Sequence, residues 1–181
     1  MPVSVSVPVL IPMSLPACLA LWVAVGAVGM DLQSQQIDNV WILIAAILGF
    51  GYQVFHPGGR GVLAYVLGCG IPLLILWIFF RFRMLGAGDI KLLSVLGGIM
   101  GREAILACMF WSLLFGAVFS VAILSTCGSW LSRLNYFTDY VRKYLMTGTR
   151  EPYRVSRGEA EHLHFSVPVL LGVLLWIGGF Y

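Results

Sequence analysis

Two aspartates stand where an apolar segment meets a polar one, and carboxylates in such places can do chemistry. Asp89 follows the run Gly86-Ala87-Gly88 and opens an apolar segment, whereas Asp31 follows the first apolar segment of the chain. A carboxylate at or inside the hydrocarbon of a membrane costs ~2.5 to 3.5 kcal/mol by the mildest scale, so each aspartate is a functional-site candidate. Two carboxylates supplied by two helices are the smallest set that could hydrolyse a peptide bond.

Acid–base chemistry would divide the work between the two carboxylates. They cannot both ionise cheaply in one site, so one keeps a proton while the other acts as a base towards water. The protonated one then donates a hydrogen bond to the oxyanion that develops on the scissile carbonyl. Asp89 opens a helix and Asp31 closes one, so the helix dipole predicts Asp89 as the base and Asp31 as the acid. No metal, cofactor or covalent intermediate is needed.

The composition excludes a soluble globular protein. Of the 181 residues, 60% are hydrophobic and only 10% are charged, and the mean hydropathy is +0.92. In lipid only helices and closed barrels satisfy every backbone polar group, and the apolar segments lack the alternation of a barrel strand. We therefore expect an all-α integral membrane protein, one membrane-embedded domain over residues 1–181, with the lipid bilayer and no nucleic acid as a partner.

Six apolar segments are predicted to be transmembrane helices, at approximately 9–30, 40–55, 62–80, 90–100, 104–127 and 165–181. The fourth segment is short for a membrane span. If it dipped into the membrane and returned, however, the basic stretch 133–157 would lie outside, which the positive-inside rule disfavours, so we expect it to cross. If all six cross, one side holds nine basic residues: Arg81, Arg83, Lys91, Arg133, Arg142, Lys143, Arg150, Arg154 and Arg157. Only Arg60 and Arg102 face the other side. The positive-inside rule makes the basic side cytoplasmic, which predicts a multi-pass protein of the cytoplasmic (inner) membrane with both termini outside.

The one long polar region, residues 128–163, is predicted to be a cytoplasmic loop that contains an interfacial helix. Apolar side chains recur there at steps of three and four, at Trp130, Leu134, Phe137, Val141 and Tyr144. With basic residues among them, this pattern is typical of an amphipathic helix that lies on an anionic membrane surface.

Residues close to the two aspartates have candidate supporting roles. Gly86 and Gly88 could let an extended peptide approach Asp89, which makes them candidate substrate-binding residues together with Lys91. Lys91 could also be a cytoplasmic anchor, or favour the ionised form of the aspartate pair. Asp38 or Asn39 is expected to cap the helix that follows.

His162 and His164 form a His-x-His sequence before the last apolar segment. No third ligand with suitable spacing is evident, so interfacial anchoring is expected rather than metal binding.

At these positions the chain resembles the type IV prepilin peptidases, which are membrane aspartyl proteases of the Gly-x-Gly-Asp group. The resemblance rests on the run 86–91, on Asp31 with Ile37 and Asn39 after the first segment, and on the sequence Phe165-Ser166-Val167-Pro168 at the start of the last. It implies removal of the short basic leader from type IV prepilin-like precursors at the cytoplasmic face, with Asp31 and Asp89 as the catalytic pair.

Two departures from the family pattern are visible. The paired Cys-x-x-Cys motifs of the larger members, which also methylate their product, do not occur, so the resemblance is to a short form and methylation is not expected. Asp38 stands where a proline is common in the family, which affects the shape of that loop.

Two alternatives stay open. An intramembrane protease of the presenilin kind would place a tyrosine before the first aspartate, deep inside a helix, whereas here Met30 precedes Asp31 at a helix end. A non-enzymatic transport or assembly component would use Asp31 and Asp89 as an ion or proton site.

Overall fold

The computed structural model describes residues 14–55, 61–82, 85–126, 138, 142 and 164–181. These residues contain six helices: α1 (Leu15–Ser34), α2 (Asn39–Phe55), α3 (Gly61–Arg81), α4 (Ala87–Met100), α5 (Arg102–Thr126) and α7 (Ser166–Ile177). No strand occurs in the described part of the chain, which confirms the all-α prediction there. The interfacial helix predicted within 128–163 lies, apart from residues 138 and 142, outside the described residues.

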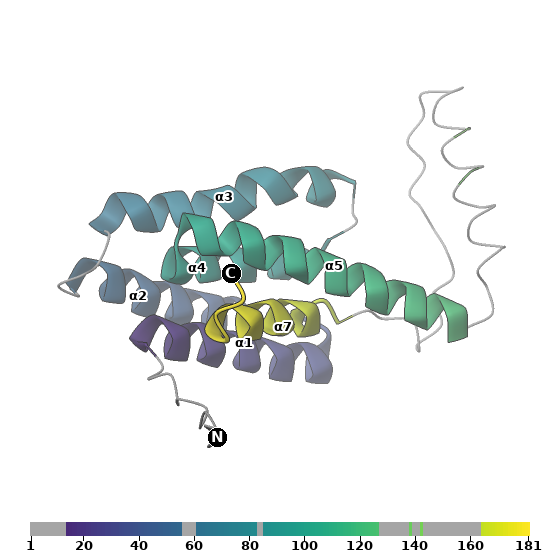
Figure 1. Ribbon diagram of the computed structural model, residues 1–181, viewed down its shortest axis with the longest axis horizontal. Coiled ribbons are helices and arrows are strands. Elements are labelled where there is room, and N and C mark those ends of the chain that lie inside the picture. Colours follow the sequence, from purple (N-terminus) through teal and green to yellow (C-terminus); the bar gives the residue numbers. More distant parts are fainter. Residues whose placement is uncertain (1–13, 56–60, 83–84, 127–137, 139–141, 143–163) are drawn as a thin grey trace, which may run out of the picture.

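The six labelled helices lie with their axes roughly along one direction, and the chain runs back and forth along it (Figure 1). α4 contacts α1, α2, α3 and α5, and α7 contacts α1 and α5. Helices far apart in sequence therefore meet, and the end of α1 packs beside α4 and α7.

Helix α4 is the core of this arrangement. From Ile90 to Met100 every residue except Lys91 is buried. Its backbone touches that of α3, because a Cβ atom added at Gly68 would lie 2.2 Å from the carbonyl oxygen of Gly97. A helix enclosed by four others need not present a full span of apolar surface to lipid, which explains why the fourth apolar segment is so short.

The outer helices expose apolar side chains. Examples on α2 and α3 are Leu43, Ile47, Leu63, Leu74 and Trp77. Three helical stretches are long and apolar enough to cross a membrane, namely Leu15–Ser34, Gly61–Arg81 and Arg102–Ile123, while α2 and α7 are apolar but shorter. Exposed apolar surface on this scale is expected for a membrane protein and not for a soluble monomer.

Candidate active site

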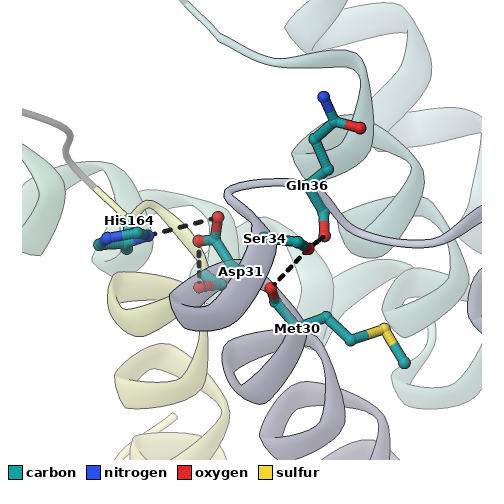
Figure 2. A network of polar contacts seen from close by, with 6 residues as sticks. Met30, Asp31, Ser34, Gln36 and His164 are labelled. Carbon is teal, nitrogen blue, oxygen red and sulfur yellow. Dashed lines mark hydrogen bonds and ion pairs between the residues drawn. The ribbon is translucent and has the colours of Figure 1, made fainter.

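Asp31 lies in the last turn of α1, where it is buried with 9% of its surface exposed. The turn is closed locally: the backbone N–H of Gln35, in the left-handed conformation, donates to the carbonyl oxygen of Asp31 over 2.9 Å. The hydroxyl of Ser34 contacts the carbonyl oxygens of Met30, at 2.9 Å, and Gln36, at 3.0 Å (Figure 2). Because these contacts satisfy the helix end, the helix continues past the apolar stretch and presents the Asp31 carboxylate to its neighbours.

Asp89 lies in the first turn of α4, three residues after the N-cap Gly86. Its carboxylate turns back to accept a hydrogen bond from the backbone N–H of Gly86, as the acidic residue of a capping box does. A Cβ atom added at Gly86 would lie 3.0 Å from Oδ2 of Asp89. Glycine at this position therefore makes room for the folded-back carboxylate.

The structure brings the two aspartates to the same end of the helices. Asp89 precedes the apolar stretch that starts at Ile90, and burial, followed by the nearby negative charge of Asp31, raises the pKa of Asp89 from 3.8 to about 6. The Gly86 N–H partly opposes this rise. The two carboxylates are thus electrostatically coupled, as an aspartate pair that shares one proton must be.

Two contacts from the start of α7 compensate the Asp31 carboxylate. Ser166 donates a hydrogen bond from Oγ to Oδ2 of Asp31 over 2.5 Å, and Nδ1 of His164 lies 3.4 Å from Oδ1. Figure 2 shows the His164 ring beside the Asp31 side chain. The prediction of an interfacial anchor missed this contact of His164. The helix-dipole argument at Asp31 also omitted both contacts, because each spans more than a hundred residues of sequence.

Lys91 points to α2 rather than to the aspartates. Its Nζ donates to Oδ1 of Asn39 over 2.7 Å at an exposed position, which links the first turns of α4 and α2. Oδ1 of Asp38 accepts the backbone N–H of Val40 over 3.0 Å, so of the two expected capping residues Asp38 is the one that caps α2.

Gly88 faces the connection between α1 and α2. A Cβ atom added there would lie 3.5 Å from Cβ of Ile37, an ordinary van der Waals distance. Gly88 therefore has a neighbour inside the protein, and the described geometry does not require a glycine at this position.

The profile of one protein family, described as the type IV leader peptidase family, matches residues 17–121, more than half of the chain. The chain belongs to this family. Membership in the type IV leader peptidases confirms the resemblance seen in the sequence and implies aspartic peptidase activity in general. No curated protein and no solved structure matches the chain.

The part of the chain that matches the family includes both aspartates and runs from α1 into α5. His164 and Ser166 lie beyond it, at the start of α7. Spacing alone gave no means of linking these two residues to Asp31, and the one local indication was the position of Ser166 within the sequence Phe165-Ser166-Val167-Pro168.

Proposed function

We propose that the protein is a membrane aspartic endopeptidase that removes the short basic leader from type IV prepilin-like precursors at the cytoplasmic face of the cytoplasmic membrane. The observation that supports this most is that Asp31, in the last turn of α1, lies near enough to Asp89, in the first turn of α4, for its charge to raise the pKa of Asp89. Family membership supports the reaction class, and carboxylates alone are sufficient for it. The substrate is the precursor protein.

Six membrane crossings with both termini outside fit this proposal. Arg81 ends α3 and Lys91 lies near the start of α4, so both lie at the end of the helices that holds the aspartates. Arg102 opens α5 at the opposite end. This distribution supports a cytoplasmic position for the aspartates, where a precursor would present its leader before export.

Hydrolysis by the pair proceeds through addition and elimination. The ionised aspartate takes a proton from water as the water oxygen bonds to the scissile carbonyl carbon, and the protonated aspartate gives its proton to the carbonyl oxygen. The first aspartate then passes its new proton to the leaving nitrogen as the C–N bond breaks. The second recovers a proton from the hydroxyl as the carboxylic acid forms, which restores the starting state.

The test is cleavage of a co-expressed pilin precursor in membranes by the intact protein and by the variants Asp31→Asn and Asp89→Asn. Each substitution removes an acid–base group, so we expect a loss of at least roughly 100-fold in the rate of leader removal. Asp38→Asn is the matched control, because Asp38 occupies the same connection but caps α2.

Cleavage that survives Asp31→Asn or Asp89→Asn would exclude that residue from the chemistry. If the intact protein left every precursor encoded beside it uncut, the ion-site or proton-site interpretation of the aspartates would replace the peptidase proposal.

A further inference from the structure

The contacts of Asp31 with the start of α7 include a buried hydroxyl group, that of Ser166, which binds a carboxylate on another helix. Ser166 is the first residue of α7 and is fully buried. Its Oγ donates across the interface to Oδ2 of Asp31, on another helix. His164 approaches the other carboxylate oxygen, so each oxygen has one partner from the same short segment.

Such an arrangement acts on charge as well as on position. A buried donor to a carboxylate favours its ionised form, and a protonated imidazole would add an ion pair. Asp31 needs this compensation because it lies at the negative end of the α1 dipole. Asp89 accepts a backbone N–H from Gly86, and burial and repulsion act against its charge.

The charged groups around Asp31 come from several elements. Asp89 of α4 and His164, just before α7, face it. Lys91 of α4 donates to Asn39 at the start of α2, and Asp38 before α2 accepts the N–H of Val40. Among the residues that the structure describes, His164 and Ser166 are thus the ones that contact the Asp31 carboxylate.

We infer that His164 and Ser166 are positioning residues that hold Asp31 ionised and oriented, so that in the resting enzyme Asp31 is the base and Asp89 holds the proton. This inference rests on the proposed peptidase function and reverses the assignment from helix dipoles alone. In the reaction, Asp31 accepts the proton of the attacking water and passes it to the leaving nitrogen. Asp89 protonates the carbonyl oxygen and later recovers a proton from the hydroxyl, while His164 and Ser166 keep theirs throughout.

The first test is the pH profile of leader cleavage for the full-length protein and the variants Ser166→Ala, His164→Val and His164→Asn. Removing a donor favours protonated Asp31, so we expect Ser166→Ala and His164→Val to move the acidic limb upward by about one pH unit and to leave the alkaline limb in place. His164→Asn keeps an N–H group near the position of Nδ1, so we expect its acidic limb to shift less than that of His164→Val.

Ser112→Ala is the matched control for Ser166→Ala. Ser112 is equally buried, in the helix that packs on α7, and its hydroxyl donates to the carbonyl oxygen of Cys108 over 2.7 Å. We expect this variant to keep both limbs of the wild-type profile. Rates that fall equally at every pH in Ser166→Ala and His164→Val would show a merely structural role and overturn the inference.

A second measurement does not depend on cleavage. In Asp89→Asn protein, infrared spectroscopy follows the ionisation of Asp31, with the double variant Asp31→Asn/Asp89→Asn identifying its band. Adding Ser166→Ala should move the midpoint of this ionisation to higher pH. If the midpoint did not move, the inference would be overturned. If the midpoint moved but the intact protein cut no precursor, the role of Ser166 would be supported and only the peptidase proposal would be refuted.

Discussion

Asp31 and Asp89 act as a pair in the proposed mechanism but are held in opposite ways. Asp89 opens a helix, and its partner is the backbone N–H of Gly86, three residues earlier. Asp31 closes a helix, and its partner Ser166 lies 135 residues later. A helix N-terminus offers free N–H groups to a carboxylate, whereas a C-terminus offers only carbonyl oxygens, so a carboxylate there must find its donors on another element.

The largest effect that this comparison predicts concerns the pH dependence of stability. The folded-state pKa of Asp89 is about 6, above its ordinary 3.8, so the folded protein binds the proton more tightly than the unfolded chain. The stabilisation from the proton is full below pH 3.8 and is lost as the pH rises through 6, up to roughly 3 kcal/mol. The side chain in Asp89→Asn cannot ionise. The temperature at which this variant unfolds in detergent should therefore lie above that of the intact protein, by a margin that grows as the pH rises from 4.5 to 8.

The variant Asp31→Asn tests how much of this pH dependence comes from the charge of Asp31. It removes the repulsion on Asp89 but leaves its burial, so the pH dependence should become weaker without disappearing. Asp38→Asn is the control and should follow the intact protein. A stability difference between Asp89→Asn and the intact protein that stays constant with pH would contradict the raised pKa of Asp89, and an unchanged pH dependence in Asp31→Asn would contradict the coupling of the two carboxylates.

The same contrast explains which parts of the site could be predicted from the sequence. Asp89, its glycines and its place at a helix start follow from a short run of residues. Hydropathy likewise indicated the all-α class and located the apolar core of each helix described. Information of this kind is local, and local sequence patterns determine where a helix can begin.

The partners of Asp31 could not be predicted, because they depend on the packing of α1 against α7. Even the end of α1 was placed too early: the apolar stretch stops at Met30, but the helix continues to Ser34. The contacts of the Ser34 hydroxyl and the left-handed Gln35 complete the final turn without apolar side chains. Hydropathy does not detect such hydrogen bonds, and spacing does not reveal which distant serine will reach a carboxylate.

A smaller effect distinguishes the two glycines before Asp89. Alanine at Gly86 would press on Oδ2 of Asp89, which must then move by a few tenths of an ångström, so we expect kcat for cleavage to fall roughly threefold to tenfold with KM unchanged. The φ of −73° at Gly86 suits alanine, so unfolding should change little.

Gly88→Ala is the counterpart of Gly86→Ala within the same turn. The added methyl group meets Ile37 at an ordinary distance, and replacing a helical glycine should raise the free energy of unfolding by up to about 1 kcal/mol with cleavage retained. A clear rise in KM would contradict this expectation and favour the sequence-based hypothesis that an extended peptide needs the space beside Gly88.

The smallest effect concerns Lys91, which stands two residues from Asp89 but bonds to Asn39. Lys91→Met and Asn39→Ala each break this exposed contact, and a double-variant cycle should give a coupling of about 0.3 to 1 kcal/mol in unfolding. Neither variant should move the pH profile of cleavage, because the ammonium group is directed at α2. If Lys91→Met alone moved the acidic limb upward, the positive charge of the lysine would contribute to the electrostatics of the aspartate pair, and the ionisation of Asp89 would depend on a charged side chain as well as on the backbone N–H of Gly86.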